Sequence, residues 1–312
     1  MVLGRKLMAA SRLRSLMHAS RPARGTAAAV ALATLGATAA AGMLAAPASA
    51  AATARAGHPG DRYNVGATHS PQLLRQLAGG PTAPAALPSN GPAQAANRLG
   101  VDVAAYQHPN GAPIHWAKVA RSGITFAAVK ATEGTYYENP YALSDLEAAQ
   151  AAGLSVGAYA FAIPNGNGGH PGAVKQADYL LNYLGPLAAT VPVMLDIEYN
   201  PYGGGACYGR RGLKMVSWVQ RFSAEILART GRVPYIYTPQ GWWDPCTGDS
   251  AVLRTDPLWV PSYTTASSPA IPAGWATWKV WQYSSSGTVP GISDPGFIDL
   301  DRLRRGVTSL GP

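Results

Sequence analysis

Apolar residues beyond position 98 fall into two kinds of stretch that alternate along the chain. Short runs rich in Val, Ile, Ala and aromatic residues have the length of buried strands. The eight predicted strands are residues 100–104, 125–130, 155–161, 191–197, 233–237, 257–261, 279–283 and 297–300. Longer stretches with helical periodicity predict helices after the first five strands, at 116–121, 141–152, 172–184, 213–230 and near Gly241.

This alternation predicts an α/β fold with a parallel sheet, because parallel strands need long crossover connections, which are usually helices. Eight such strands predict a closed sheet, here an incomplete TIM-like barrel without helices after its last three strands. The alternative is an open doubly wound sheet. That fold would carry a Gly-rich phosphate loop after a strand, and none of the predicted strands is followed by one.

Residues 1–50 have the pattern of a secretory signal peptide. An Ala-rich apolar stretch spans 26–46, and Ala48-Ser49-Ala50 offers the small residues of a cleavage site. A transmembrane anchor is the alternative, but it would be richer in Leu and Ile. Met17 is a second candidate start, and it would leave the mature chain unchanged. The basic residues before the apolar stretch are Arg5, Lys6, Arg12, Arg14, Arg21 and Arg24.

Residues 51–98 are rich in Ala, Gly and Pro and predict a linker, since such a composition buries little apolar surface. The remaining residues, 99–312, have the length of one domain. The formal charge of +9 falls to +3 once the signal peptide is removed. We therefore expect no nucleic-acid partner, which would need a concentrated basic face. A secreted monomer, associated with an anionic cell wall and with no stable membrane attachment after cleavage, fits this balance.

Cys207 and Cys246 are the two cysteines of the chain. In an oxidising compartment they predict a disulfide, here between two Gly- and Pro-rich loops at 200–212 and 244–249. A zinc site would need a second Cys pair or a His-rich motif, and neither is present. We accordingly expect no metal and no cofactor.

The predicted strand at 191–197 leads directly into two carboxylates, Asp196 and Glu198. Side chains alternate across a strand, so both acids point to the same side while Ile197 points away. Burying two charges is costly unless a site uses them. Glycoside hydrolysis is such a use, because it needs one protonated acid and one carboxylate. The alternative is a helix-capping or salt-bridged pair at a strand end.

In a TIM-like barrel the carboxyl ends of the strands converge, so polar residues near those ends should lie together. Aromatic faces stack on sugar rings and carboxylates cleave or bind them, which favours a glycosidase groove. For any single aromatic residue core packing is the favoured interpretation, and it is their coincidence at the strand ends that favours a groove. The residues expected at this rim, besides Asp196 and Glu198, are Asp102, Tyr159, Phe161, Tyr237, Tyr263, Trp281, Gln282 and Asp299.

Several segments carry a resemblance to a known family. They are Gly100-Val-Asp-Val-Ala-Ala-Tyr-Gln107, Phe126-Ala-Ala-Val-Lys-Ala-Thr-Glu-Gly-Thr135, Gly153-Leu-Ser-Val-Gly-Ala-Tyr159, Leu195-Asp-Ile-Glu-Tyr-Asn-Pro-Tyr202 and Trp281-Gln-Tyr-Ser284. In this order they resemble the motifs of glycoside hydrolase family 25, the Chalaropsis-type lysozymes. The resemblance runs from about residue 99 to the C-terminus. It is strongest toward secreted actinobacterial muramidases, given the Trp242-Trp-Asp-Pro-Cys-Thr-Gly248 segment.

The resemblance implies hydrolysis of the β-1,4 bond between N-acetylmuramic acid and N-acetylglucosamine in peptidoglycan. It implies that Glu198 is the proton donor, with Asp196 as its partner and Asp102 and Asp299 as further catalytic acids. Asp294 and Asp301 lie close to Asp299 in the sequence and are alternatives for the last role. Ala160 departs from the family pattern, in which a larger residue often follows Gly-Ala-Tyr.

The stereochemical outcome stays open at this stage. Asp196 and Glu198 are two strand residues apart, and their flexible side chains allow both the shorter carboxyl–carboxyl distance of retaining enzymes and the longer one of inverting enzymes. A third route uses the substrate's own 2-acetamido group, oriented by Asp196, and we favour retention by this route. A non-catalytic wall-binding barrel is the main rival function, but it would lose the acids that this chain keeps. A chitinase-type enzyme would carry a longer Asp-rich motif on the fourth strand.

Overall fold

The computed structural model describes residues 98–164, 172–293 and 297–311, and these form a closed barrel. Each strand pairs with its neighbours, and β1 pairs with both β2 and β9, which closes the sheet. The expected signal peptide and most of the linker lie outside the described residues. The barrel strands are β1 (Leu99–Val103), β2 (Ile124–Glu133), β4 (Ser155–Phe161), β5 (Val193–Asp196), β6 (Tyr235–Tyr237), β7 (Leu258–Pro261), β8 (Val280–Gly287) and β9 (Ile298–Leu303).

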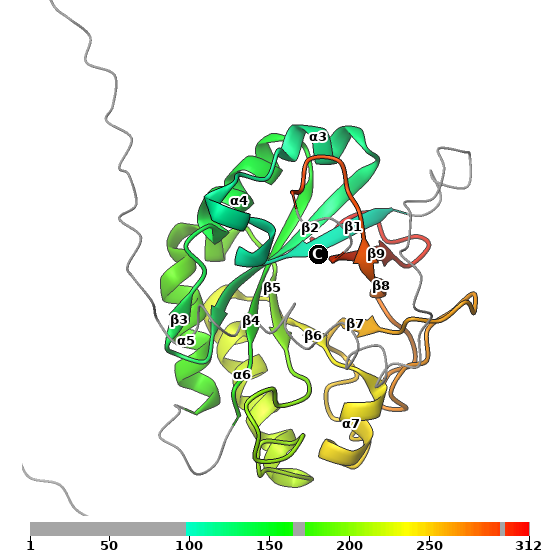
Figure 1. Ribbon diagram of the computed structural model, residues 1–312. Coiled ribbons are helices and arrows are strands. Elements are labelled where there is room, and N and C mark those ends of the chain that lie inside the picture. The colour runs from blue at the N-terminus through cyan, green and yellow to red at the C-terminus, as the bar shows by residue number, and fades with distance from the viewer. Residues whose placement is uncertain (1–97, 165–171, 294–296, 312) are drawn as a thin grey trace, which may run out of the picture. The chain divides into compact units, whose positions relative to one another are not determined.

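Five α-helices among the described residues connect the first six barrel strands, the last of which is β7, and β8 and β9 follow through loops. Figure 1 shows α3 to α6 along one side of the barrel. These helices are α3 (Trp116–Arg121), α4 (Ala142–Ala151), α5 (Ala173–Leu184), α6 (Leu213–Thr230) and α7 (Gln240–Thr247). The minor elements are β3 (Tyr137–Glu138), which pairs with the end of β2, and the 3-10 turns η2 (Ala105–Gln107), η3 (Pro109–Gly111) and η4 (Gly185–Ala189). The incomplete TIM-like α/β barrel predicted from the sequence is confirmed.

The direction of β9 differs from the prediction of a fully parallel sheet. It runs antiparallel to both β1 and β8. The described residues of the connection from β8 contain no helix, and without a crossover the chain returns in the opposite direction. The first residues of β9 therefore lie at the rim where the other strands end.

Two apolar layers hold the barrel together. Outside it, strand residues such as Val101 and Leu195 pack against the helices. Inside it, a second cluster contains Tyr159, Met194 and Trp259. The interior is filled so tightly that a Cβ on Gly100 would stand 2.2 Å from the Phe126 ring. The amino half of the lumen is thus a packed core, and the polar residues gather at the opposite end.

Candidate active site

The four acids expected at the rim come together. Asp102 lies on β1 directly opposite Asp299 on β9, Asp196 ends β5, and Glu198 follows two residues later. Their exposed fractions are only 3 to 8 %. Asp299 is the second residue of β9. Because β9 runs antiparallel to its neighbours, its first residues lie at the carboxyl ends of the other strands, and this brings Asp299 to the rim. Four buried acids at one rim form the acidic centre of the barrel.

Gln282 on β8 orients Asp102. The phenol oxygens of Tyr237 and Tyr263 donate to its Oε1 over 3.1 and 2.6 Å, so the Gln282 amide oxygen has two donors. Its Nε2 then faces Asp102 and donates to Oδ2 over 2.8 Å. Since the carbonyl end can only accept, the two tyrosines fix which way the amide points. Sequence analysis had placed all three residues at this rim.

Burial is the largest cause of the raised pKa values in the acidic centre. Burial, opposed by the charge of Lys130 and aided by that of Asp102, raises the pKa of Glu198 to about 8. The pKa of Asp196 is also well above its usual value, first through burial and then through the charge of Glu198. Since the ionisation of one group affects the other, the two carboxyl groups titrate as a pair. One oxygen of each, Asp196 Oδ1 and Glu198 Oε2, has no hydrogen-bond partner among the described residues.

Lys130 and Glu133, on β2, form a buried ion pair beside these acids, and this pairing was not predicted from the sequence. Lys130 Nζ lies 2.7 Å from Glu133 Oε2, and neither residue is exposed. The other Glu133 oxygen accepts hydrogen bonds from Tyr136 and Tyr202. A lysine inside a strand that is otherwise apolar was the available signal, because a buried lysine needs an acidic partner.

Three of the expected sugar-contacting residues, Tyr159, Phe161 and Trp281, are buried and are not brought to an open surface. Phe161 is fully buried, and its ring lies under Lys130 Nζ at 4.9 Å. Trp281 is adjacent to Gln282 and therefore faces the outside of the barrel. It is also fully buried there, with Nε1 donating to Ser262 and its ring 3.8 Å from the Arg302 guanidinium.

A cavity of about 170 Å³ opens beside Glu198, and Tyr237 and Tyr263 line it together with Gln240. Tyr159 lies in the lumen instead, with its ring against Trp259 at 6.0 Å. A larger cavity of about 500 Å³ lies around the first residues of β5, β6 and β7. None of the four rim acids lines it, whereas Glu198 lines the smaller cavity. Among the described residues, no three His, Cys, Asp or Glu are placed to hold a metal ion.

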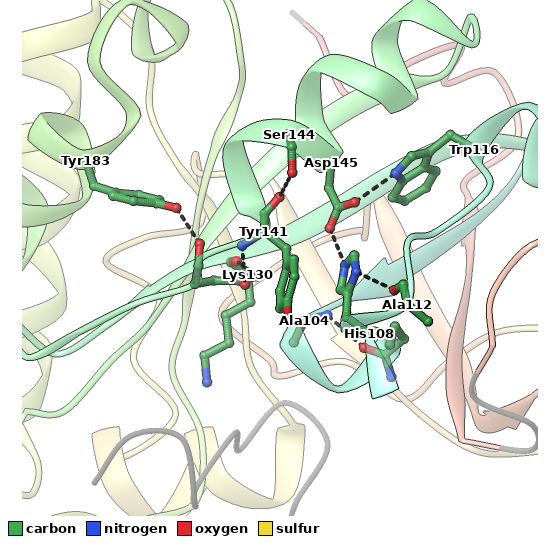
Figure 2. A network of polar contacts seen from close by, with 11 residues as sticks. Ala104, His108, Ala112, Trp116, Lys130, Tyr141, Ser144, Asp145 and Tyr183 are labelled. Carbon is green, nitrogen blue, oxygen red and sulfur yellow. Dashed lines mark hydrogen bonds and ion pairs between the residues drawn. The ribbon is translucent and has the colours of Figure 1, made fainter. Parts of the chain in front are cut away.

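The connection after β1 is held against α3 and α4 by a buried polar cluster (Figure 2). His108 Nε2 lies 2.8 Å from Asp145 Oδ2, and Trp116 Nε1 donates to the other oxygen over 3.0 Å. His108 Nδ1 lies 3.0 Å from the Ala112 carbonyl oxygen, and the imidazole stacks on Tyr141 at 3.9 Å. The His108 ring and the Asp145 carboxyl thus join the connection after β1 to both helices.

Cys207 and Cys246 form the predicted disulfide, with Cα atoms 5.5 Å apart. The location of Cys246 differs from the prediction, because it lies in the last turn of α7 and not in a loop. Pro245 precedes it inside the helix, and this Gly- and Pro-containing sequence had suggested a loop. The bridge joins α7 to the segment that follows Glu198, and Trp242 Nε1 donates to Ala206 in the same segment over 2.9 Å.

A closed α/β barrel that gathers buried acids and tyrosines at the carboxyl ends of its strands defines a glycoside hydrolase. The model of glycosyl hydrolases family 25 matches residues 101–292, and the chain belongs to this family. Lysozyme M1 of Streptomyces globisporus is 38% identical over 70% of this chain and 72% of its own length. The N,O-diacetylmuramidase of Chalaropsis is 34% identical over 66% of this chain and 97% of its own.

Solved structures agree with this family. A bacterial lysozyme from Streptomyces coelicolor is 37% identical and matches 66% of this chain and 91% of its own, with a TM-score of 0.59. A family GH25 lysozyme from Aspergillus fumigatus is 33% identical over 67% of this chain and 94% of its own, with a TM-score of 0.58. The protein is thus similar to both bacterial and fungal lysozymes.

Proposed function

We propose that this enzyme hydrolyses the β-1,4 bond between N-acetylmuramic acid and N-acetylglucosamine in peptidoglycan. The observation that carries the proposal is the buried pair of Asp196 and Glu198 beside a cavity walled by tyrosines. The muramidase names of the relatives support the same substrate. No helix among the described residues is long and apolar enough to cross a membrane.

Glu198 is the proton donor in this proposal. Its raised pKa keeps the carboxyl protonated near neutral pH, as protonation of the leaving glycosidic oxygen requires. Asp196 orients the substrate's 2-acetamido group for attack on the anomeric carbon, and Asp102 and Asp299 balance the positive charge that develops on the sugar. Tyr237, Tyr263 and Gln282 contact the sugar or hold the acids in place. Proton NMR of the first anomer released tests this route, which requires net retention.

The proposal includes export. Residues 1–50 act as a signal peptide, 51–98 as a linker and 99–312 as the catalytic barrel, and the mature enzyme is a monomer that works outside the cell at the wall. The Cys207–Cys246 disulfide fits an oxidising compartment. Amino-terminal sequencing of secreted protein tests the cleavage site after Ala50, and sedimentation tests the monomer.

The Glu198→Gln variant tests the assignment of the proton donor. The amide keeps the shape of the side chain but cannot donate a proton to the leaving oxygen, so lysis of purified walls should fall by about 10² to 10⁴. The matched control is Glu147→Gln, the same change at an exposed position on α4, which should lyse like the wild type. Turbidity gives the rate, and the sugar at the new reducing end should be N-acetylmuramic acid.

Two outcomes would contradict these assignments. Wild-type protein that binds walls and releases no reducing ends would make the barrel a wall-binding module. Glu198→Gln that keeps most of the wild-type rate would remove Glu198 from the donor role and leave the family activity intact.

A further inference from the structure

Asp301 is a fifth acid of the barrel interior, one layer below the rim. It lies on β9 two residues after Asp299, so the two side chains share the inner face of the strand. It is fully buried, with none of its surface exposed. The role proposed above for the four rim acids does not use this group.

The hydrogen bonds around Asp301 indicate its protonation state. Trp259 Nε1 donates to Asp301 Oδ1 over 2.7 Å, which satisfies one oxygen. The other oxygen, Oδ2, has no partner among the described residues if Asp301 is a carboxylate. Asp301 and Asp102 lie on the paired strands β9 and β1, and their carboxyl groups interact across the barrel interior. A hydrogen bond between two carboxyl groups needs one proton, which one of the two would carry.

The charges around Asp301 favour the proton on that residue. The groups facing it are Asp102 on β1, Asp299 on its own strand, Trp259 on β7 and Tyr283 on β8, none of which is a cation. Arg302, the next residue, places its guanidinium on the Trp281 and Tyr283 rings at 3.8 and 4.7 Å. Burial, and then the charge of Asp102, raise the pKa of Asp301 well above its usual value. Asp102 already accepts from Gln282, and its pKa reaches only about 6.

We propose that Asp301 is a neutral carboxylic acid that donates a hydrogen bond to Asp102, and that it is a positioning residue for the reaction proposed above. The bond turns Asp102 toward the rim as an acceptor and helps to keep it ionised while the surrounding burial opposes ionisation. Trp259 holds the second oxygen and thereby fixes which oxygen of Asp301 carries the proton. The role at Asp102 rests on the proposed function, whereas the protonation state of Asp301 does not.

Two variants separate a neutral Asp301 from an ionised one. In Asp301→Asn the amide oxygen still accepts from Trp259 and the amide nitrogen still donates to Asp102. This variant should keep the larger part of the wall-lysis rate and the wild-type acid limb of the pH profile. Asp301→Leu has no donor. The pKa of Asp102 should rise, because the lost hydrogen bond lowered it, and the acid limb should move to higher pH.

The opposite result would overturn the proposal. If Asp301 is ionised in the working enzyme, Asp301→Asn removes a negative charge beside Asp102. The acid limb would then move to lower pH, or the rate would fall as far as in Asp301→Leu.

NMR of protein with carbon-13-labelled aspartate carboxyls measures the protonation of each group directly. It needs neither enzyme activity nor a variant that is stable at every pH. The wild-type spectrum should contain a carboxylic-acid signal that persists above about pH 6, where Asp102 ionises. Its loss in either Asp301 variant assigns it. A wild-type spectrum with every aspartate ionised at about pH 8, two units above that value, contradicts a neutral Asp301. If wild-type protein releases no reducing ends from walls, the proposed function fails, and this signal still decides the state of Asp301.

Discussion

Glu198 retains a proton because the fold buries it, and its acidic neighbours reinforce the effect. Period-two alternation was enough to place Asp196 and Glu198 on one side of a strand end. Burial is the largest cause of the raised pKa of Glu198, and among the charges that of Lys130 lowers it and that of Asp102 raises it. The sequence could not reveal this, because the burial of a group depends on the strands that surround it.

The dependence of Glu198 on Asp102 gives a pH prediction. The alkaline limb of the rate should follow the ionisation of Glu198, near its pKa of about 8. Asp102→Asn removes a negative charge that raises this pKa, so the limb should move to lower pH while the maximum rate falls. The control is Asp178→Asn, a half-exposed carboxyl on α5 paired with Arg229, which should leave the profile unchanged. If the alkaline limb of Asp102→Asn lay at the same pH as that of the wild type, the charge of Asp102 would not affect the pKa of Glu198.

Strand order and helix placement were predictable at the scale of elements, and strand ends were less so. The prediction began three strands too early, at Val191, Val233 and Pro257. The observed strands β5, β6 and β7 each begin directly after a proline, at Val193, Tyr235 and Leu258. Proline has no N–H to donate to a sheet, so it is found before or at the first residue of a strand. The direction of β9 was missed because a hydrophobic run carries no information about its orientation.

The connection after β1 depends on a buried hydrogen-bonded pair that no local pattern indicated, since His108 and Asp145 are 37 residues apart. Asp145→Asn should destabilise the barrel, because the amide cannot replace the carboxylate toward both His108 and Trp116. Leaving a buried polar group without its partner costs about 1–3 kcal/mol. Urea unfolding followed by tryptophan fluorescence measures this, with Glu147→Gln on the same helix as the matched change at an exposed carboxyl. Equal midpoints for Asp145→Asn and Glu147→Gln would mean that the pair does not stabilise the connection.

At the scale of the whole molecule, the acidic centre and Asp301 set how stability depends on pH. Burial raises the pKa of Asp102 to about 6 and that of Glu198 to about 8, and it raises those of Asp196, Asp299 and Asp301 well above their usual values. Unfolded carboxyl groups titrate near pH 4. Above about pH 4 the unfolded chain therefore releases protons that the folded protein still keeps. In that range a rise in pH favours the unfolded chain and lowers the free energy of unfolding. This part of the stability is complete below about pH 4 and is lost as the pH rises through the folded pKa values.

The free energy of unfolding should accordingly fall between about pH 4 and pH 8, and it should fall less in Glu198→Gln than in the wild type. The amide does not titrate, so the variant escapes the loss that one acid with a raised pKa contributes, which amounts to about 1.4 kcal/mol per pH unit at most. The difference in unfolding free energy should therefore shift in favour of the variant as the pH rises and should level off once the pH exceeds the pKa of Glu198, about 8. Urea midpoints at several pH values measure the difference, and Glu147→Gln should run parallel to the wild type. Parallel curves for Glu198→Gln and the wild type would mean that Glu198 ionises as freely in the barrel as in the unfolded chain, and the donor role argued from its burial would then have no physical basis.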